Sequence, residues 1–290
     1  MNKRRFAAFG ALALMLILSA CAAQPTAPPV APAAPVQPAE PPAVVATEVG
    51  PTVAAEVAVM PGPVMAVGST YAYFDGSVLV AVPAGEFVMG GDGQDNPRHI
   101  VSLSDFWIYQ VEVSNHMYRL CVDLGNCSPP DPKDNPIFYD RREGSKPVVG
   151  LNWSQASDYC GFVNGRLPTE AEWEKTMRGP DGNLYPWGNE APTCNLLNFD
   201  ACIHKTTFVG SYPQGESYYK ALDGAGNVFE WVNDWYSANY YGAAPTQDPP
   251  GAASGSRRAV RSSAFNTDGY LTEVSRRFFA EIRQWLSPMN

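Results

Sequence analysis

The sequence predicts a single α+β domain, irregular and rich in loops, that spans residues 70–290. Short apolar runs typical of strands are concentrated near its beginning, and the few helical patterns that follow are brief. Gly and Pro recur through the second half, where turn signals separate short elements. No internal repeat is visible, so we expect one large domain with long connections.

The expected strands lie in the first part of this domain. Residues 78–83 and 86–89 are apolar runs separated by an Ala-Gly turn. Residues 99–103 alternate between apolar and polar side chains, as a half-buried strand does. Residues 106–111 form a third apolar run. Together these runs predict a small sheet at the start of the domain.

Three helices are expected after these strands. Ser114 is a candidate N-cap for a helix that continues to Cys121. A second helix is predicted near residues 154–163. The third begins at Thr169, whose hydroxyl is expected to form a capping box with Glu172, three residues later.

The N-terminus has the pattern of an export signal. Three basic residues at 3–5 precede a short apolar stretch at 6–17, which is too short for a stable membrane span. Residues 18–21 match a bacterial lipobox, so we expect residues 1–21 to be a lipoprotein signal with Cys21 lipidated. The alternative is an ordinary secretory signal cleaved near Ala20, which leaves Cys21 unmodified.

Residues 22–65 are rich in Pro and Ala and carry little charge. Such a segment buries no core, and we expect a disordered, extended linker. The net charge of −9 argues against nucleic acid as a partner and against electrostatic binding to anionic lipid. We therefore expect an extracytoplasmic protein anchored to a bacterial membrane through its lipid alone.

The other cysteines fall into two close pairs and one single residue. Outside the cytoplasm, close pairs at loop ends predict disulfides, here between Cys121 and Cys127 and between Cys194 and Cys202. Cys160 lies in an apolar helical pattern and is expected to be a buried free thiol. A transition-metal site is not expected, because no CxxC spacing occurs and the three histidines are scattered.

Three motifs occur in a fixed order, at residues 165–175 (GRLPTEAEWEK), 185–189 (YPWGN) and 226–236 (GNVFEWVNDWY). In these segments the chain resembles the formylglycine-generating enzyme, or sulfatase-modifying factor, family. The resemblance covers nearly all of residues 73–265. It implies that family's fold, a variant of the C-type lectin fold.

The resemblance also implies structural calcium. By position, the ligands would be two side chains and two backbone carbonyls, from Asp223, Gly226, Val228 and Glu230. Ca²⁺ prefers such oxygen donors. The alternative is a Gly-rich turn that Asp223 caps. A looser match places a second calcium near Asn195, Leu196 and Asp200.

The chain departs from the family at its copper site. The two cysteines that bind copper in the family's oxidase correspond to Thr267 and Thr272, and the paired glycines before them correspond to Ser262 and Ser263. A hydroxyl does not replace a thiolate toward copper, so copper is not expected. The serine pair would be strained if positive φ is required there, and residues 266–290 are expected to pack differently from the family.

We therefore favour a non-catalytic recognition module in the cell envelope, with a glycan or envelope protein as ligand. The aromatic run at 235–241 is a candidate contact surface, although its side chains fill a core equally well. The alternatives are an oxidase that converts a sulfatase cysteine to formylglycine, and a purely structural envelope protein. Glu170, Glu172 and Glu174 are not expected to be catalytic.

Overall fold

The computed structural model describes residues 16–18, 21–23, 65–200 and 202–281. Residues 24–64 lie outside the described residues, as do most of the predicted signal and the end of the chain. The linker and signal predictions are therefore not tested here. In the part of the chain that is described, no helix is long and apolar enough to cross a membrane.

The first sheet has five strands in the order β3-β4-β7-β2-β8, and every neighbouring pair is antiparallel. Its strands are β3 (Thr70–Ala72), β4 (Val78–Val82), β7 (Phe106–Tyr109), β2 (Ala22–Ala23) and β8 (Gly165–Arg166). The apolar runs that predicted β4 and β7 supply buried residues, Val80 and Ile108 among them. These two expected strands are confirmed.

The second sheet has the order β1-β9-β10-β11. Its strands are β1 (Leu16–Leu18), β9 (Phe229–Trp235), β10 (Arg257–Arg261) and β11 (Phe278–Glu281). Strand β1 runs parallel to β9, and the other pairs are antiparallel. Residues 16–18, which are part of the predicted signal, thus pair with the domain in the uncleaved chain. Their backbone N–H and C=O groups supply hydrogen-bond partners to the edge of β9.

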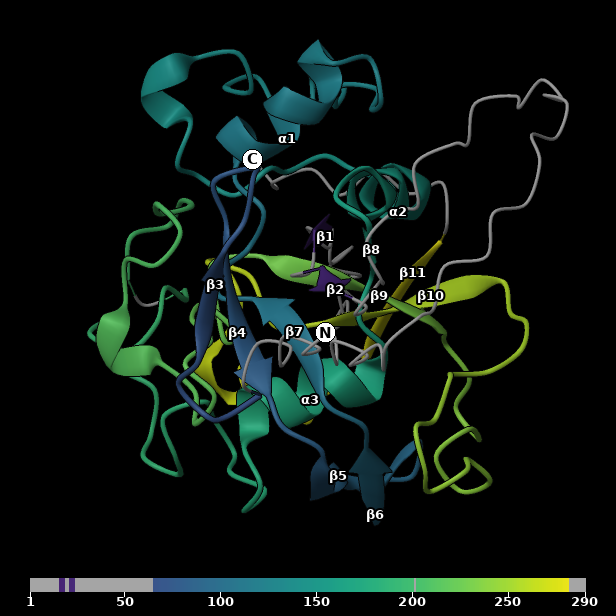
Figure 1. The fold of residues 1–290 in the computed structure, drawn as a ribbon. Coiled ribbons are helices and arrows are strands. Elements are labelled where there is room, and N and C mark those ends of the chain that lie inside the picture. The colour runs from purple at the N-terminus through teal and green to yellow at the C-terminus, as the bar shows by residue number, and fades with distance from the viewer. Residues whose placement is uncertain (1–15, 19–20, 24–64, 201, 282–290) are drawn as a thin grey trace, which may run out of the picture. The chain divides into compact units, whose positions relative to one another are not determined.

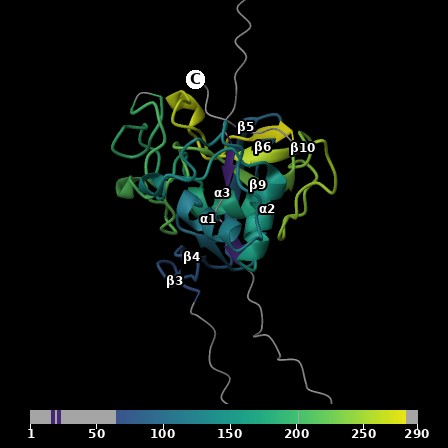
Figure 2. The same cartoon turned by 90° about the horizontal axis from the view of Figure 1, so that it is seen from above.

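A separate hairpin joins β5 (Gly85–Gly93) to β6 (Asn96–Leu103). Strand β5 contains the run expected at 86–89, and β6 contains the run expected at 99–103. A bulge interrupts their register between Gly91 and Asp92. In Figure 2, β3 and β4 lie on one side of the helices and the β5–β6 hairpin on the other.

All three predicted helices are present: α1 (Asn115–Asp123), α2 (Trp153–Phe162) and α3 (Glu170–Arg178). Ser114 and Asn152 cap the first two with their side chains. Figure 1 shows α1 and α2 above β7 and β9, and α3 between β7 and the β5–β6 hairpin. The 3₁₀ turns η1 (Arg141–Glu143), η2 (Pro213–Gly215) and η3 (Gly269–Leu271) interrupt the long connections.

Disulfides crosslink the domain at three places. Cys121 pairs with Cys127 and Cys194 with Cys202, as predicted. The prediction of a free thiol at Cys160 is wrong: its sulfur is buried as expected, but it is bonded to Cys21. This third bond forms because β2 places Cys21 against α2, a contact that no sequence spacing reveals.

Candidate functional site

The motif at residues 165–175 builds helix α3 and its start. The Thr169 hydroxyl accepts a hydrogen bond from the backbone N–H of Glu172 (3.2 Å), and the Glu172 carboxylate accepts one from the N–H of Thr169 (2.8 Å). This is the predicted capping box. The Arg166 guanidinium also donates two hydrogen bonds to the Glu172 carboxylate, at 2.7 and 2.6 Å. Glu172 is therefore occupied by structural contacts.

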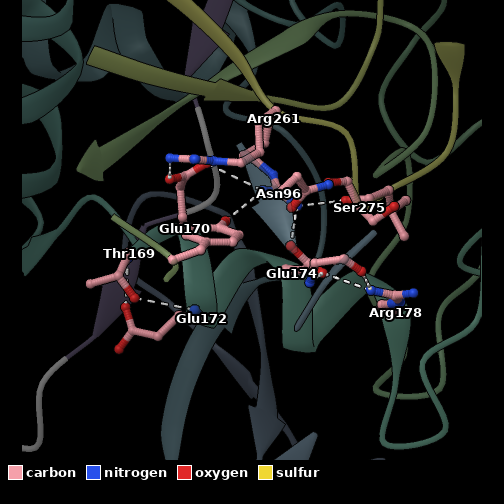
Figure 3. Close-up of polar contacts among 12 residues, drawn as sticks. Asn96, Thr169, Glu170, Glu172, Glu174, Arg178, Arg261 and Ser275 are labelled. Carbon is pink, nitrogen blue, oxygen red and sulfur yellow. Dashed lines mark hydrogen bonds and ion pairs between the residues drawn. The ribbon is translucent and has the colours of Figure 1, made fainter. Parts of the chain in front are cut away.

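The other two glutamates of α3 enter a buried ion-pair network. Arg261 contacts Glu170 at 3.3 Å and Glu174 at 2.6 Å. Arg277 pairs with Glu170 at 2.8 Å, and Arg178 pairs with Glu174 at 2.9 Å. Figure 3 shows Arg261 spanning both carboxylates. Each carboxylate thus has two guanidinium partners, a structural use that leaves neither available as a general base.

The electrostatics of Glu170 follow from this pairing. Burial alone would raise the pKa of its carboxyl, but Arg277 and Arg261 outweigh burial and hold the pKa below its ordinary value. Asp234 lies beside it and accepts the backbone N–H of Glu170 at 2.8 Å. Burial, with the nearby charge of Glu170, raises the pKa of Asp234. The network therefore contains a carboxylate held charged next to one that favours its protonated form.

The positions that correspond to the copper cysteines carry hydroxyls with local structural bonds. Thr267 Oγ1 accepts a hydrogen bond from the N–H of Ala264 (2.9 Å), and Thr272 Oγ1 donates one to the carbonyl of Gly269 (2.7 Å). Both residues are buried. All six cysteines of the chain are in disulfides. No thiolate is therefore available to bind copper at this place.

One serine of the pair before these positions has the backbone conformation that the sequence suggested. Ser262 has φ of 65°, in the left-handed region where glycine is favoured. Its neighbour Ser263 is not among the residues with positive φ. The Ser263 hydroxyl instead accepts the N–H of Gly226 at 2.9 Å. One serine is thus strained and the other is a hydrogen-bond partner of the predicted calcium loop.

The predicted calcium loop gathers buried carboxylates. Asp223 and Glu230 are both buried, and a third carboxylate, Glu112, is buried beside them. Burial raises the pKa of Asp223 to about 6. Burial raises the pKa of Glu112 well above its ordinary value, and the charges of Asp223 and Glu230 raise it further. Buried carboxylates this close together are costly unless protons or a cation neutralise them.

These donors fit a hard cation only with help from the backbone. Among the described residues, no group of three or more His, Cys, Asp or Glu side chains is arranged to hold a metal ion. The carbonyls of Gly226 and Val228 would have to complete the shell, as Ca²⁺ often requires. Asp223 (59°), Gly226 (84°) and Asn227 (57°) have positive φ, so the loop is a tight turn. The carbonyl of Gly226 accepts the N–H of Val228 at 2.7 Å, and its second lone pair would be the one used for a cation. Glu112 was missed by sequence reasoning, because it lies more than 100 residues away.

The second calcium prediction receives less support. Asn195 and Asp200 are exposed and Leu196 is partly buried. Asp200 lies 3.7 Å from the ring of His204. The buried amide of this loop is instead Asn198, which donates to the carbonyl of Lys205 at 2.7 Å. The predicted donors of this second site are thus mostly at the surface.

A polar cleft of about 360 Å³ lies between the tip of the β5–β6 hairpin and the segment before β11. Its lining comprises Gly91, Asp92, Gly93, Asp95, Asn96, Arg98, Leu184, Glu273, Ser275, Arg276, Arg277 and Phe278. Asp95 is fixed by the Tyr236 hydroxyl, which donates to it at 2.6 Å. Arg277 donates to the carbonyls of Asp95 and Ser237, at 2.7 and 3.2 Å. Arg277 therefore connects the cleft to the ion-pair network, because it also pairs with Glu170.

The aromatic run at 235–241 is mostly structural. Arg258 lies between Trp235 and Trp153, with its guanidinium carbon 3.6 Å from each ring centroid. Tyr241 is buried, and the Tyr240 hydroxyl accepts the N–H of Gly251 at 3.0 Å. Within this run, the Tyr236 hydroxyl makes a hydrogen bond to a residue of the cleft, Asp95.

The sequence model of one protein family, the sulfatase-modifying factor enzyme 1-like domain (FGE-sulfatase), matches residues 69–285, three quarters of the chain. The chain belongs to this family. Its predicted fold, an irregular α+β variant of the C-type lectin fold, is accordingly that of a formylglycine-generating-enzyme-like domain. A formylglycine-generating enzyme of Streptomyces coelicolor is 30% identical over 247 residues, which cover 64% of this chain and 78% of that one.

Similarity also extends to proteins with other named functions. A hercynine oxygenase of Mycolicibacterium smegmatis is 28% identical over 64% of this chain and 54% of its own length. A serine/threonine-protein kinase, pkn1 of Chlamydia pneumoniae, is 33% identical over 65% of this chain but only 33% of its own length. Family membership alone therefore does not assign a reaction to this chain.

Two solved structures share the fold. PvdO from Pseudomonas aeruginosa matches with a TM-score of 0.62 and 19% identity, over 76% of this chain and 95% of that one. Treponema denticola variable protein 1 matches with a TM-score of 0.61 and 24% identity, over the same shares. At these identities the likeness concerns the fold alone.

Proposed function

We propose that this protein is a lipid-anchored cell-envelope protein whose sulfatase-modifying-factor-like domain is a non-catalytic binding module. The observation that carries the proposal is the chemistry at Thr267 and Thr272. The oxidase that the family resemblance implies needs two thiolates, which bind Cu(I) because both partners are soft. Here both side chains are hydroxyls with local structural hydrogen bonds.

The polar cleft is the surface we propose for the ligand. Its volume of about 360 Å³ is within the usual range for small-ligand sites, about 300–1,000 Å³. Arg98 pairs with Asp92 at 3.3 Å and Arg276 with Glu273 at 3.5 Å. Because these charges are paired within the protein, a neutral polar ligand such as a glycan suits the cleft better than a strongly charged one.

The oxidase alternative is tested by mass spectrometry of a Cys-x-Pro-x-Arg peptide. The full chain is incubated with the peptide, copper, calcium, reductant and oxygen, and an active formylglycine-generating enzyme serves as positive control. We expect no conversion of the peptide cysteine. Conversion by the full chain, retained in a Thr267→Ala, Thr272→Ala variant, would show that other groups perform the chemistry and would refute the binding-module proposal.

The cleft is tested by glycan-array binding of the full chain and of two tyrosine variants. Tyr236→Phe removes the hydroxyl that fixes Asp95, whereas Tyr139→Phe alters an exposed tyrosine on the α1 side of the domain. We expect saturable binding that Tyr236→Phe weakens and Tyr139→Phe leaves unchanged. Equal binding by both variants would remove the cleft from consideration, and pull-down with envelope proteins would then test a protein ligand.

A further inference from the structure

Strand β2 fills a slot in the first sheet that β7 and β8 leave open. Ala22 is opposite Ile108 of β7 and also opposite Arg166 of β8, so the strand is hydrogen-bonded on both sides. Just before it, the carbonyl of Cys21 accepts the backbone N–H of Tyr109 at 3.3 Å. Figure 1 shows the purple β2 between β7 and β8. The residues around the lipobox cysteine are thus part of the sheet.

The Cys21 side chain is closed inside the domain. It is 1% exposed and Cys160 is 0% exposed. Their sulfurs are bonded, with Cα atoms 5.6 Å apart, a separation within the normal range for a disulfide. A sulfur at this position has no room for a lipid and no free valence to carry one.

We propose that Cys21 has two mutually exclusive fates, lipidation or a disulfide to Cys160, and that Cys160 thereby sets the fraction of the protein that is membrane-anchored. The proposal rests on the lipoprotein part of the proposed function. It assigns to Cys160 a role that neither the family nor the lipobox requires. In the anchored form Cys21 leaves its buried position, so residues 21–23 leave the slot and Cys160 is a free thiol.

The two reactions compete for one thiol. In lipidation, the Cys21 sulfur forms a thioether to a glycerol carbon of a phospholipid, and the head group leaves with the thiol proton. In disulfide formation, Cys21 and Cys160 together lose two protons and two electrons. A dithiol–disulfide oxidoreductase of the envelope accepts them and is itself reduced to the dithiol. Both reactions use the thiolate, so whichever occurs first excludes the other.

The test uses the full chain expressed in a bacterium that exports and lipidates proteins. Cells receive an alkyne-labelled fatty acid, and free thiols are alkylated before lysis. Lipid-labelled and unlabelled protein are then separated, and each pool is digested without reduction for mass spectrometry. The variants are Cys160→Ser and, as matched control, Cys194→Ser with Cys202→Ser, which removes a disulfide without touching Cys21.

We expect the unlabelled wild-type pool to contain the Cys21–Cys160 cross-linked peptide and the labelled pool to contain alkylated Cys160. Cys160→Ser should raise the labelled fraction, and the Cys194 and Cys202 control should not. An unlabelled pool without the cross-link, or an unchanged labelled fraction in Cys160→Ser, would overturn the proposal. Absence of label from every variant, with a known lipoprotein labelled in the same cells, would instead refute the lipid anchor itself.

Discussion

Replacing Ser262 by glycine should stabilise the domain. Its φ of 65° costs an L-residue about 1–2 kcal/mol relative to the right-handed region. Glycine removes that cost but adds about 0.5–1 kcal/mol of unfolded-state entropy. The hydroxyl contributes little, since its contacts to the carbonyls of Gly226 and Ser263 are both 3.4 Å long. The net gain expected for Ser262→Gly is about 0.5–1 kcal/mol.

The adjacent serine supplies a control of opposite sign. Ser263→Gly removes a fully buried hydroxyl that accepts the N–H of Gly226 at 2.9 Å. Leaving that N–H unsatisfied costs about 1–3 kcal/mol. Urea denaturation of both variants measures the difference, and Tm should rise by about 1–4 °C in Ser262→Gly. If Ser262→Gly destabilises the domain as Ser263→Gly does, the inference of backbone strain is incorrect.

Three further predictions concern charge, pH and crosslinks. Arg261→Met should lower the free energy of unfolding by about 3–5 kcal/mol, because the buried Glu170 and Glu174 each lose a guanidinium partner. Urea denaturation measures this loss, and a value under about 1 kcal/mol would contradict the prediction. Without calcium, stability should fall as pH rises from 3.8 to about 6, since the folded Asp223 carboxyl holds a proton that the unfolded one has lost. Calcium should reduce that fall in Tm measurements, and Asp223→Asn should abolish the calcium effect. Removing the Cys194–Cys202 bond with serines should cost about 2–3 kcal/mol, and an unchanged urea midpoint would exclude a stabilising role.

Local features of this fold could be predicted because their causes are local in sequence. The capping box needs only Thr169 and Glu172, three residues apart. The disulfides within Cys121–Cys127 and Cys194–Cys202 close short loops, at separations of 6 and 8 residues. The alternating run at 99–103 shows its period within a single strand.

The rest could not be predicted because its causes are distant in sequence. Arg261 reaches Glu170 and Glu174 across 91 and 87 residues. Cys21 reaches Cys160 across 139 residues, so the position of Cys160 in an apolar helix indicated burial but not its partner. The carboxylate of Glu112 joins the calcium loop by tertiary packing, and no spacing in the sequence marks it.

The ion pairs of α3 constrain when this domain can fold during synthesis. Every residue of α3 is buried, yet Glu170 takes guanidinium partners only from Arg261 and Arg277 among the described residues. A nascent chain that ends before residue 261 would have to bury this charge alone, at a cost that a marginally stable domain does not tolerate. We therefore expect the domain to fold only after residues up to Arg277 have been made, so its native ion pairs form late in synthesis.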